Sequence, residues 1–287
     1  MNRRQPFVPH GLAMFVAGRS PGELLRGLEA AHDHGFHEVQ LNLLWYPVAR
    51  QEVQEVKAKL QRYEMIARVA GVYNDLTLFY SYHFFQMSGR ELKQQIELLP
   101  EIGVESIAVW SGSFQDDLLA VDGRNRTVEA RRMLQNNVES LLALLEEHRM
   151  KLLIEPWITH VLGSENEVAE FCATYHERVG SIVDIPNFIA VSDWKRRHER
   201  IPAIVESLTL SAGAVHLKDM SVRENGEFEL PYAGAGQLDY DLILSSLKPV
   251  WGKMPFVIEH MTMEQVPQVL NFLVPKLRQN HYHLEGA

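Results

Sequence analysis

Four short apolar runs in the second half of the chain each end at a carboxylate or an imidazole. They occupy residues 151–155, 181–184, 214–216 and 256–259, and their last residues are Glu155, Asp184, His216 and Glu259. A continuous apolar run is typical of a strand in a sheet that is covered on both faces. The four polar ends lie 29, 32 and 43 residues apart, close to the length of one strand–helix–strand unit. This recurrence predicts a sheet of parallel strands separated by helices.

The rest of the chain continues the alternation of strand and helix. We predict further strands at 11–17, 38–44, 76–83 and 106–110, and helices at 20–35, 48–69, 89–100, 124–150, 164–179, 201–210, 240–247 and 263–277. Eight such alternations without a linker or an internal repeat indicate an α/β protein, a single (β/α)8 TIM barrel domain over residues 1–287.

Composition narrows the function classes. With 28 basic and 37 acidic residues the net charge is −9, which disfavours binding to nucleic acid. The single cysteine, Cys172, allows no internal disulfide and favours a reducing cytoplasm. No apolar run approaches the roughly 18 residues of a membrane span, and the first residues lack the apolar region of a signal peptide. We therefore expect a cytoplasmic protein without a membrane partner, and homo-oligomerisation stays open.

The polar strand ends form the candidate site. In a barrel all strands point their C-terminal ends to one face, where active sites lie, so Glu155, Asp184, His216 and Glu259 should converge. Three carboxylates in one place repel one another unless a cation is present. Carboxylates with one imidazole suit Mn²⁺, Mg²⁺, Co²⁺ or Zn²⁺. The alternative is that each group caps a helix or pairs with Lys or Arg, but four coincidences at the same point of consecutive units favour the metal.

Other residues near these ends are candidates for binding substrate. Lys218 lies two residues after His216 on the same side of the strand, where it would hold a substrate oxygen or form a structural ion pair. Asn187 would either cap or touch substrate, and Arg223 and His160 lie in loops beyond the strand ends. Asp219 is more typical of an orienting residue or a helix cap than of a metal ligand.

Aromatic residues near the strand ends would wall a sugar pocket or fill the core. They are Phe15, Trp45, Tyr46, Tyr80, Tyr82, Phe84, Trp110 and Trp157.

At these residues the chain resembles the xylose isomerase-like barrel superfamily, in particular its sugar phosphate isomerase/epimerase group. The motifs that carry the resemblance are Glu155-Pro156, Asp184-Ile185-Pro186-Asn187, His216-Leu217-Lys218-Asp219, Gly234-Ala235-Gly236-Gln237-Leu238-Asp239 and Glu259. The resemblance implies that Glu155, Asp184, His216 and Glu259 bind one divalent metal ion. It also implies that Glu155 and Glu259 lie on opposite faces of the substrate.

The chain departs from that group at two positions. Relatives commonly end the second strand in glutamate, whereas this chain has Gln40. Ketose 3-epimerases usually carry a substrate-binding histidine where this chain has Asn187, which puts that activity in doubt. The additional His and Asp ligands of the three-zinc endonuclease IV branch are not evident, so DNA repair is disfavoured.

We therefore predict an isomerase or epimerase of a small sugar or polyhydroxy ketone. The metal would stabilise an enediolate while Glu155 and Glu259 act as acid and base. Loss of a β-hydroxyl from the same enolate would instead make a dehydratase, of the inosose or dehydroshikimate type. A barrel that binds a metabolite or a protein partner without chemistry is the alternative from another class, and a metal-dependent nuclease is a further one.

Overall fold

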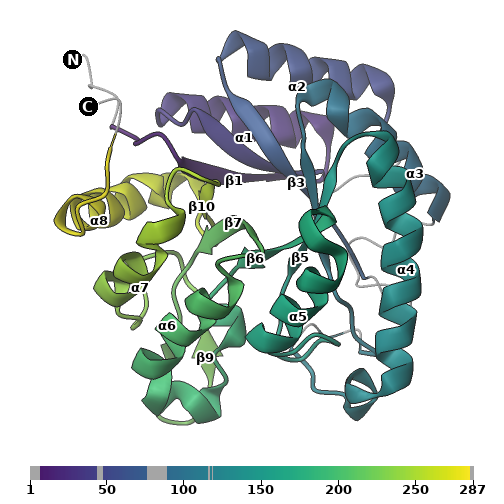
Figure 1. The fold of residues 1–287 in the computed structure, drawn as a ribbon. Coiled ribbons are helices and arrows are strands. Elements are labelled where there is room, and N and C mark those ends of the chain that lie inside the picture. The colour runs from purple at the N-terminus through teal and green to yellow at the C-terminus, as the bar shows by residue number, and fades with distance from the viewer. Residues whose placement is uncertain (1–6, 44–47, 76–88, 116, 118, 285–287) are drawn as a thin grey trace.

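The computed structural model describes residues 7–43, 48–75, 89–115, 117 and 119–284, and its centre is a closed barrel of eight parallel strands (Figure 1). The strand order around the barrel is β1-β10-β7-β6-β5-β4-β3-β2. The barrel strands are β1 (Leu12–Gly18), β2 (Glu38–Leu43), β3 (Ile66–Asp75), β4 (Ser106–Trp110), β5 (Lys151–Glu155), β6 (Val179–Val183), β7 (Ala212–Leu217) and β10 (Phe256–Ile258). The predicted TIM barrel is confirmed.

Helices surround the strands on the outside of the barrel (Figure 1). They are α1 (Pro21–Asp33), α2 (Arg50–Arg62), α3 (Gly89–Leu98), α4 (Val128–Glu147), α5 (Glu165–Tyr175), α6 (Arg197–Leu208), α7 (Tyr240–Leu247) and α8 (Val266–Gln279). The polar side chains of Ser20, Thr127 and Ser164 accept hydrogen bonds from the first turns of α1, α4 and α5, which explains where these helices begin. None of the helices among the described residues is long and apolar enough to span a membrane.

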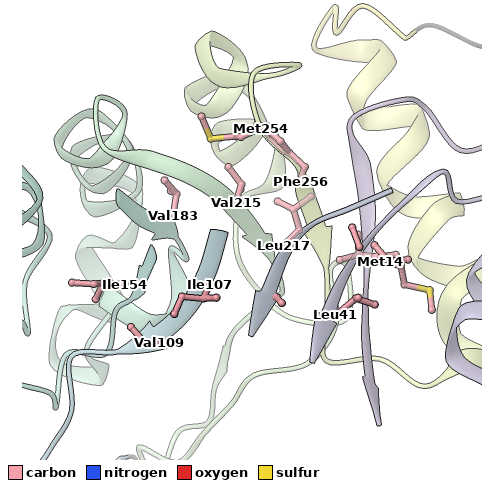
Figure 2. Packing of buried hydrophobic residues seen from close by; sticks show 14 of the residues in the cluster. Met14, Leu41, Ile107, Val109, Ile154, Val183, Val215, Leu217, Met254 and Phe256 are labelled. Atoms are coloured by element: carbon pink, nitrogen blue, oxygen red, sulfur yellow. The ribbon is translucent and has the colours of Figure 1, made fainter. Parts of the chain in front are cut away.

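Apolar side chains fill both sides of the barrel wall. The outward strand residues, such as Met14, Ile107, Ile154 and Phe256, pack in the larger core (Figure 2), the layer between sheet and helices. The smaller core inside the barrel consists of Val69, Ala108, Leu153, Ile182 and Ala214. Cys172 is buried in the outer layer.

The inner core fixes the direction of the site residues. Side chains two positions apart on a strand point to the same face. Glu155 follows the inner Leu153 by two residues, Asp184 follows Ile182, and His216 follows Ala214. These polar groups therefore point into the C-terminal mouth of the barrel, directly above its apolar plug.

The helix predicted at 48–69 was wrong at its C-terminal end. The observed β3 (Ile66–Asp75) covers residues that we assigned to the end of a long helix, and the predicted strand at 76–83 lies outside the described residues. Helix α2 ends at Arg62 because the following Glu64 has a positive φ of 52°, which a right-handed helix does not accommodate. The β-branched Val69 and Val72 then favour the strand.

The connection at 221–236, which follows β7, contains a short hairpin. Strands β8 (Ser221–Val222) and β9 (Phe228–Glu229) pair antiparallel outside the barrel. They lie in the connection after β7, on the face where the candidate site lies.

Candidate metal centre

Three ligand atoms converge at the C-terminal mouth of the barrel. One oxygen each of Glu155 and Asp184 and one ring nitrogen of His216 lie within 4.8 Å of one another, and all three residues are buried. Within the described chain, Glu155 Oε2, Asp184 Oδ1 and His216 Nδ1 have no hydrogen-bond partner. Unsatisfied polar atoms are costly in a buried position, and a divalent cation would satisfy all three. The donor set of carboxylates and imidazole therefore fits a hard or borderline divalent metal.

Glu259 is not one of these three residues, but its carboxylate lies next to them. Its Oε2 is 3.3 Å from His216 Nδ1, and its Oε1 accepts a hydrogen bond of 2.7 Å from Lys218 Nζ. Lys218 also donates to Asp184. The ammonium of Lys218 thus bridges two of the four predicted ligands, as the ion-pair alternative proposed. Glu259 as a fourth ligand stays a prediction.

Gln40 orients the imidazole. His216 Nε2 lies 3.1 Å from Gln40 Oε1, and the amide oxygen accepts from the ring N–H. This hydrogen bond leaves His216 Nδ1 facing Glu155, Asp184 and Glu259, at 3.8, 3.6 and 3.3 Å. A metal-binding histidine typically donates its other ring N–H to such a carbonyl. The presence of Gln40 in place of the glutamate common in relatives is therefore compatible with a metal ion bound to His216 Nδ1.

Asn187 holds two of the carboxylates. Its Nδ2 donates to Asp184 Oδ2 at 2.9 Å and to Glu155 Oε1 at 3.4 Å. The amide follows β6 in the turn Pro186–Phe188, so the short distance in sequence from Asp184 brings it to the site. Its substrate role stays a prediction, but it positions Glu155 and Asp184.

Burial and neighbouring charges shift the pKa values of the two glutamates in opposite directions. Burial raises the pKa of Glu155 to about 7, against the opposing charge of His216. Burial also acts on Glu259, but His216 and Lys218 hold its pKa well below the ordinary value. Despite burial, Glu259 and Glu155 raise the pKa of His216 to about 10. Without metal, the carboxylates are thus neutralised by a buried lysine and a buried imidazolium, and Glu155 is partly protonated.

These pKa values predict that the metal-free protein loses stability as the pH rises. The folded pKa of His216, about 10, exceeds its ordinary 6.5, so its contribution is complete below about pH 6.5 and disappears as the pH passes 10. The folded pKa of Glu155 is also raised, from 4.5 to about 7, and ionising it costs stability in that range. In EDTA the urea midpoint should therefore fall steadily from pH 5 to pH 10.

A divalent metal should reverse this trend, because it displaces the proton from His216 and binds more tightly as the pH rises. In the metal-free protein, His216→Gln should abolish the decline of the urea midpoint above about pH 6.5. His198→Gln, at an exposed position, should retain this decline. A midpoint independent of pH in the metal-free wild type would contradict these assignments.

Asp219 organises the glycine loop behind the site. Its Oδ1 accepts from the backbone N–H groups of Met220 and Leu238, and its Oδ2 accepts from that of Gly234. A Cβ at Gly236 would overlap the Asp219 carboxylate. The motifs around Asp219 and Gly234–Gly236 therefore form one structural unit, in which Asp219 orients backbone.

Arg126 clamps the loop that follows Glu155. Its guanidinium donates to the backbone carbonyls of Ile158, His160 and Val161. His160 is fully buried, its ring packs edge-on against Trp110 at 6.3 Å, and burial lowers its pKa to about 3. Substrate binding by His160 stays a prediction. Sequence reasoning missed Arg126, since no motif links it to a loop more than 30 residues away.

Gly163 leaves room for this clamp, and its substitution tests it. A Cβ at Gly163 would overlap the guanidinium of Arg126, which can move only by breaking its hydrogen bonds. Gly163→Ala should therefore lower the free energy of unfolding by about 1–3 kcal/mol, measured by urea denaturation. Gly123→Ala is the matched control, since a Cβ there meets nothing within 4 Å. Equal stability of the two variants would contradict the clamp.

The remaining predicted residues lie further from the ligand group. Arg223 is exposed and pairs with Glu227 and Glu229 of its own hairpin. The ring centroid of Phe15 lies 6.2 Å from that of His216, and the Trp157 ring lies 5.5 Å from Lys218 Nζ. The other predicted wall residues, Trp45, Tyr46, Tyr80, Tyr82 and Phe84, lie outside the described residues.

A cavity of about 690 Å³ opens at the opposite, N-terminal mouth of the barrel. Gly180, Ala212 and Gly213 line it together with Arg68 and Lys151. In TIM barrels the N-terminal ends of the strands contribute to stability, whereas active sites lie at the C-terminal ends. The ligand group at the C-terminal mouth is therefore the better candidate site.

The geometry defines a class of protein, a TIM barrel with a buried carboxylate and imidazole centre at its C-terminal mouth. The sequence profile of the xylose isomerase-like TIM barrel matches residues 28–274. The chain belongs to this family. A search of curated proteins finds no match.

Solved structures of this superfamily share the fold over nearly the whole chain. A xylose isomerase domain protein from Planctomyces limnophilus has a TM-score of 0.72 and 16% identity, covering 96% of this chain and 99% of that chain. An L-ribulose 3-epimerase has a TM-score of 0.70 and 12% identity, covering 94% and 95%. A xylose isomerase-like TIM barrel protein from Mycobacterium smegmatis in complex with magnesium has a TM-score of 0.63 and 15% identity, covering 90% of each chain. At these identities the likeness shows the fold alone.

Proposed function

We propose that this protein is a divalent-metal-dependent isomerase or epimerase of a small sugar or polyhydroxy ketone. The observation that carries the proposal is the group of three buried ligand atoms without hydrogen-bond partners among the described residues, flanked by Glu259. Similarity to an L-ribulose 3-epimerase and to a magnesium-bound barrel supports it.

Glu155, Asp184, His216 and Glu259 would hold the metal ion. When bound, such an ion acts as a Lewis acid that polarises a carbonyl group. Mn²⁺, Mg²⁺, Co²⁺ and Zn²⁺ all suit these donors.

The two glutamates divide the proton transfers. Glu259, which lies outside the group of three and pairs with the ammonium of Lys218, is the base that removes the proton next to the carbonyl. Glu155 returns a proton, to the opposite face of the same carbon in an epimerase or to the neighbouring carbon in an isomerase.

Other residues prepare the site for this chemistry. Asn187 fixes Glu155 through its amide, and Gln40 fixes His216. Lys218 is the donor best placed for a substrate oxygen, since its ammonium lies between Asp184 and Glu259. Burial of all these groups keeps bulk water from the reacting atoms, which strengthens each charge interaction.

Proton exchange in D₂O tests the proposal. The protein is loaded in turn with Mn²⁺, Mg²⁺, Co²⁺ and Zn²⁺ and incubated with a panel of ketoses and cyclic keto-polyols. NMR then measures deuterium at the carbon next to the carbonyl. We expect incorporation with at least one metal and none in EDTA. Loss of water from the substrate would identify a dehydratase, and no exchange with any metal and substrate would refute the proposed chemistry.

A further inference from the structure

A small apolar cavity of about 140 Å³ adjoins the metal centre on the same end of the barrel. Four segments far apart in sequence build it: the connection after β4, the loop after β5, the turn and loop after β6, and the hairpin strand β9 with the residues beyond it. Its apolar lining includes Val121, Ile158, Ile189, Val191, Phe228 and Leu230. The volume exceeds by roughly tenfold the space that one water molecule needs.

Two side chains connect the cavity to the residues of the candidate metal centre. Asn187 lines the cavity and donates to Glu155 and Asp184. Trp157 also lines it, and its ring lies 5.5 Å from Lys218 Nζ. A ligand whose reacting carbon lies at the carboxylates would therefore reach the cavity with the next part of its skeleton.

Two buried polar atoms lie where the cavity adjoins the metal centre and could bind a ligand. Of the hydrogen-bonding groups that the structure describes, Trp157 Nε1 and Asn187 Oδ1 have no partner, and their residues are only 7% and 2% exposed. One is a donor and the other an acceptor, so a hydroxyl group at the wall would satisfy both, and an ether oxygen would accept from Trp157 Nε1 alone. At the cavity's apolar rim, Val121 is 82% exposed and would be covered by a bound ligand.

We infer that this cavity binds an apolar substituent of the substrate, such as the alkyl or aryl group of a keto-glycoside. The inference rests on the proposed function and narrows its substrate class. An unsubstituted polyhydroxy ketose would place hydroxyl groups against apolar walls, where they lose their hydrogen bonds to water without replacement. The cavity is too small for a peptide segment, and its walls carry no charged side chain among the described lining residues.

A homologous ligand series tests the inference. Isothermal titration calorimetry measures the affinity of the Mn²⁺-loaded protein for keto-hexopyranosides that carry methyl, propyl, butyl or phenyl on the anomeric oxygen. Because each buried methylene contributes about 0.8 kcal/mol, affinity should increase at least about tenfold from methyl to butyl. Ala190 lines the cavity, and Ala190→Leu should fill it, removing this gain while changing the affinity for the methyl compound by less than about threefold.

Ala143→Leu, at an exposed position of α4, is the matched control and should keep the wild-type series. Equal affinity for all members in the wild type would overturn the inference and leave the proposed function intact, since the keto-sugar would still bind. An unchanged gain in Ala190→Leu would also overturn it, because the substituent would then lie elsewhere. Absence of binding by every member would also overturn the inference, and the exchange experiment with ketoses in D₂O would then decide the proposed function on its own. The wild-type series decides the question even if a variant does not fold.

Discussion

Glu259→Gln should reduce turnover by about a hundredfold to ten-thousandfold, the usual contribution of a positioned general base. The amide keeps the shape of the side chain but cannot accept the substrate proton. Asp184 continues to pair with Lys218, so far-UV circular dichroism should stay unchanged. Glu170→Gln, at an exposed position of α5, is the matched control and should keep wild-type turnover.

Comparison with Glu155→Gln assigns the two proton transfers. If Glu259 removes the proton, Glu259→Gln should abolish its exchange with D₂O, whereas Glu155→Gln should slow product formation and retain exchange. The opposite pattern would exchange the roles of the two glutamates. Turnover of Glu259→Gln within about threefold of wild type would refute its role as the base.

The strand ends were the predictable part of the site. Parallel strands in a barrel end at one face, so a polar residue after each apolar run needs no further information to be placed there. The structure brings Glu155, Asp184 and His216 into one group in this way. The spacing of about one strand–helix–strand unit between these three residues also predicts most of the fold.

Contacts between distant segments could not be predicted in the same way. Gln40 reaches His216 across 176 residues, and its hydrogen bond follows from strand order around the barrel rather than from any local pattern. The apolar cavity depends on loops and a hairpin, whose conformations are set by turn chemistry and tertiary packing. The first residues of β3, up to Val69, were assigned to a helix because the apolar residues before and after Tyr63 continue a helical spacing, while the chain turns at Glu64.

The central position of Lys218 has a consequence for stability. Its ammonium is 1% exposed and bridges Asp184 and Glu259, and these carboxylates raise its pKa against the effect of burial. Removing one partner of a buried ion pair leaves an uncompensated charge and costs about 3–5 kcal/mol. Lys218→Met should lower the free energy of unfolding of the metal-free protein by this amount at pH 7.5.

The loss should depend on pH and on metal. Lys218 helps to hold the pKa of Glu259 well below its ordinary value, so its contribution is present above pH 4.5 and shrinks as the pH falls and the carboxylate is protonated. A divalent ion supplies positive charge to the same carboxylates, and Mn²⁺ should therefore stabilise Lys218→Met more than it stabilises the wild type.

Urea unfolding followed by circular dichroism, in EDTA and in Mn²⁺ at pH 7.5, and in EDTA at pH 3, measures both effects. Lys253→Met, at an exposed position, should change stability by less than about 0.5 kcal/mol. An equal loss in Lys218→Met with and without metal would contradict the idea that Lys218 and the metal ion neutralise the same carboxylates.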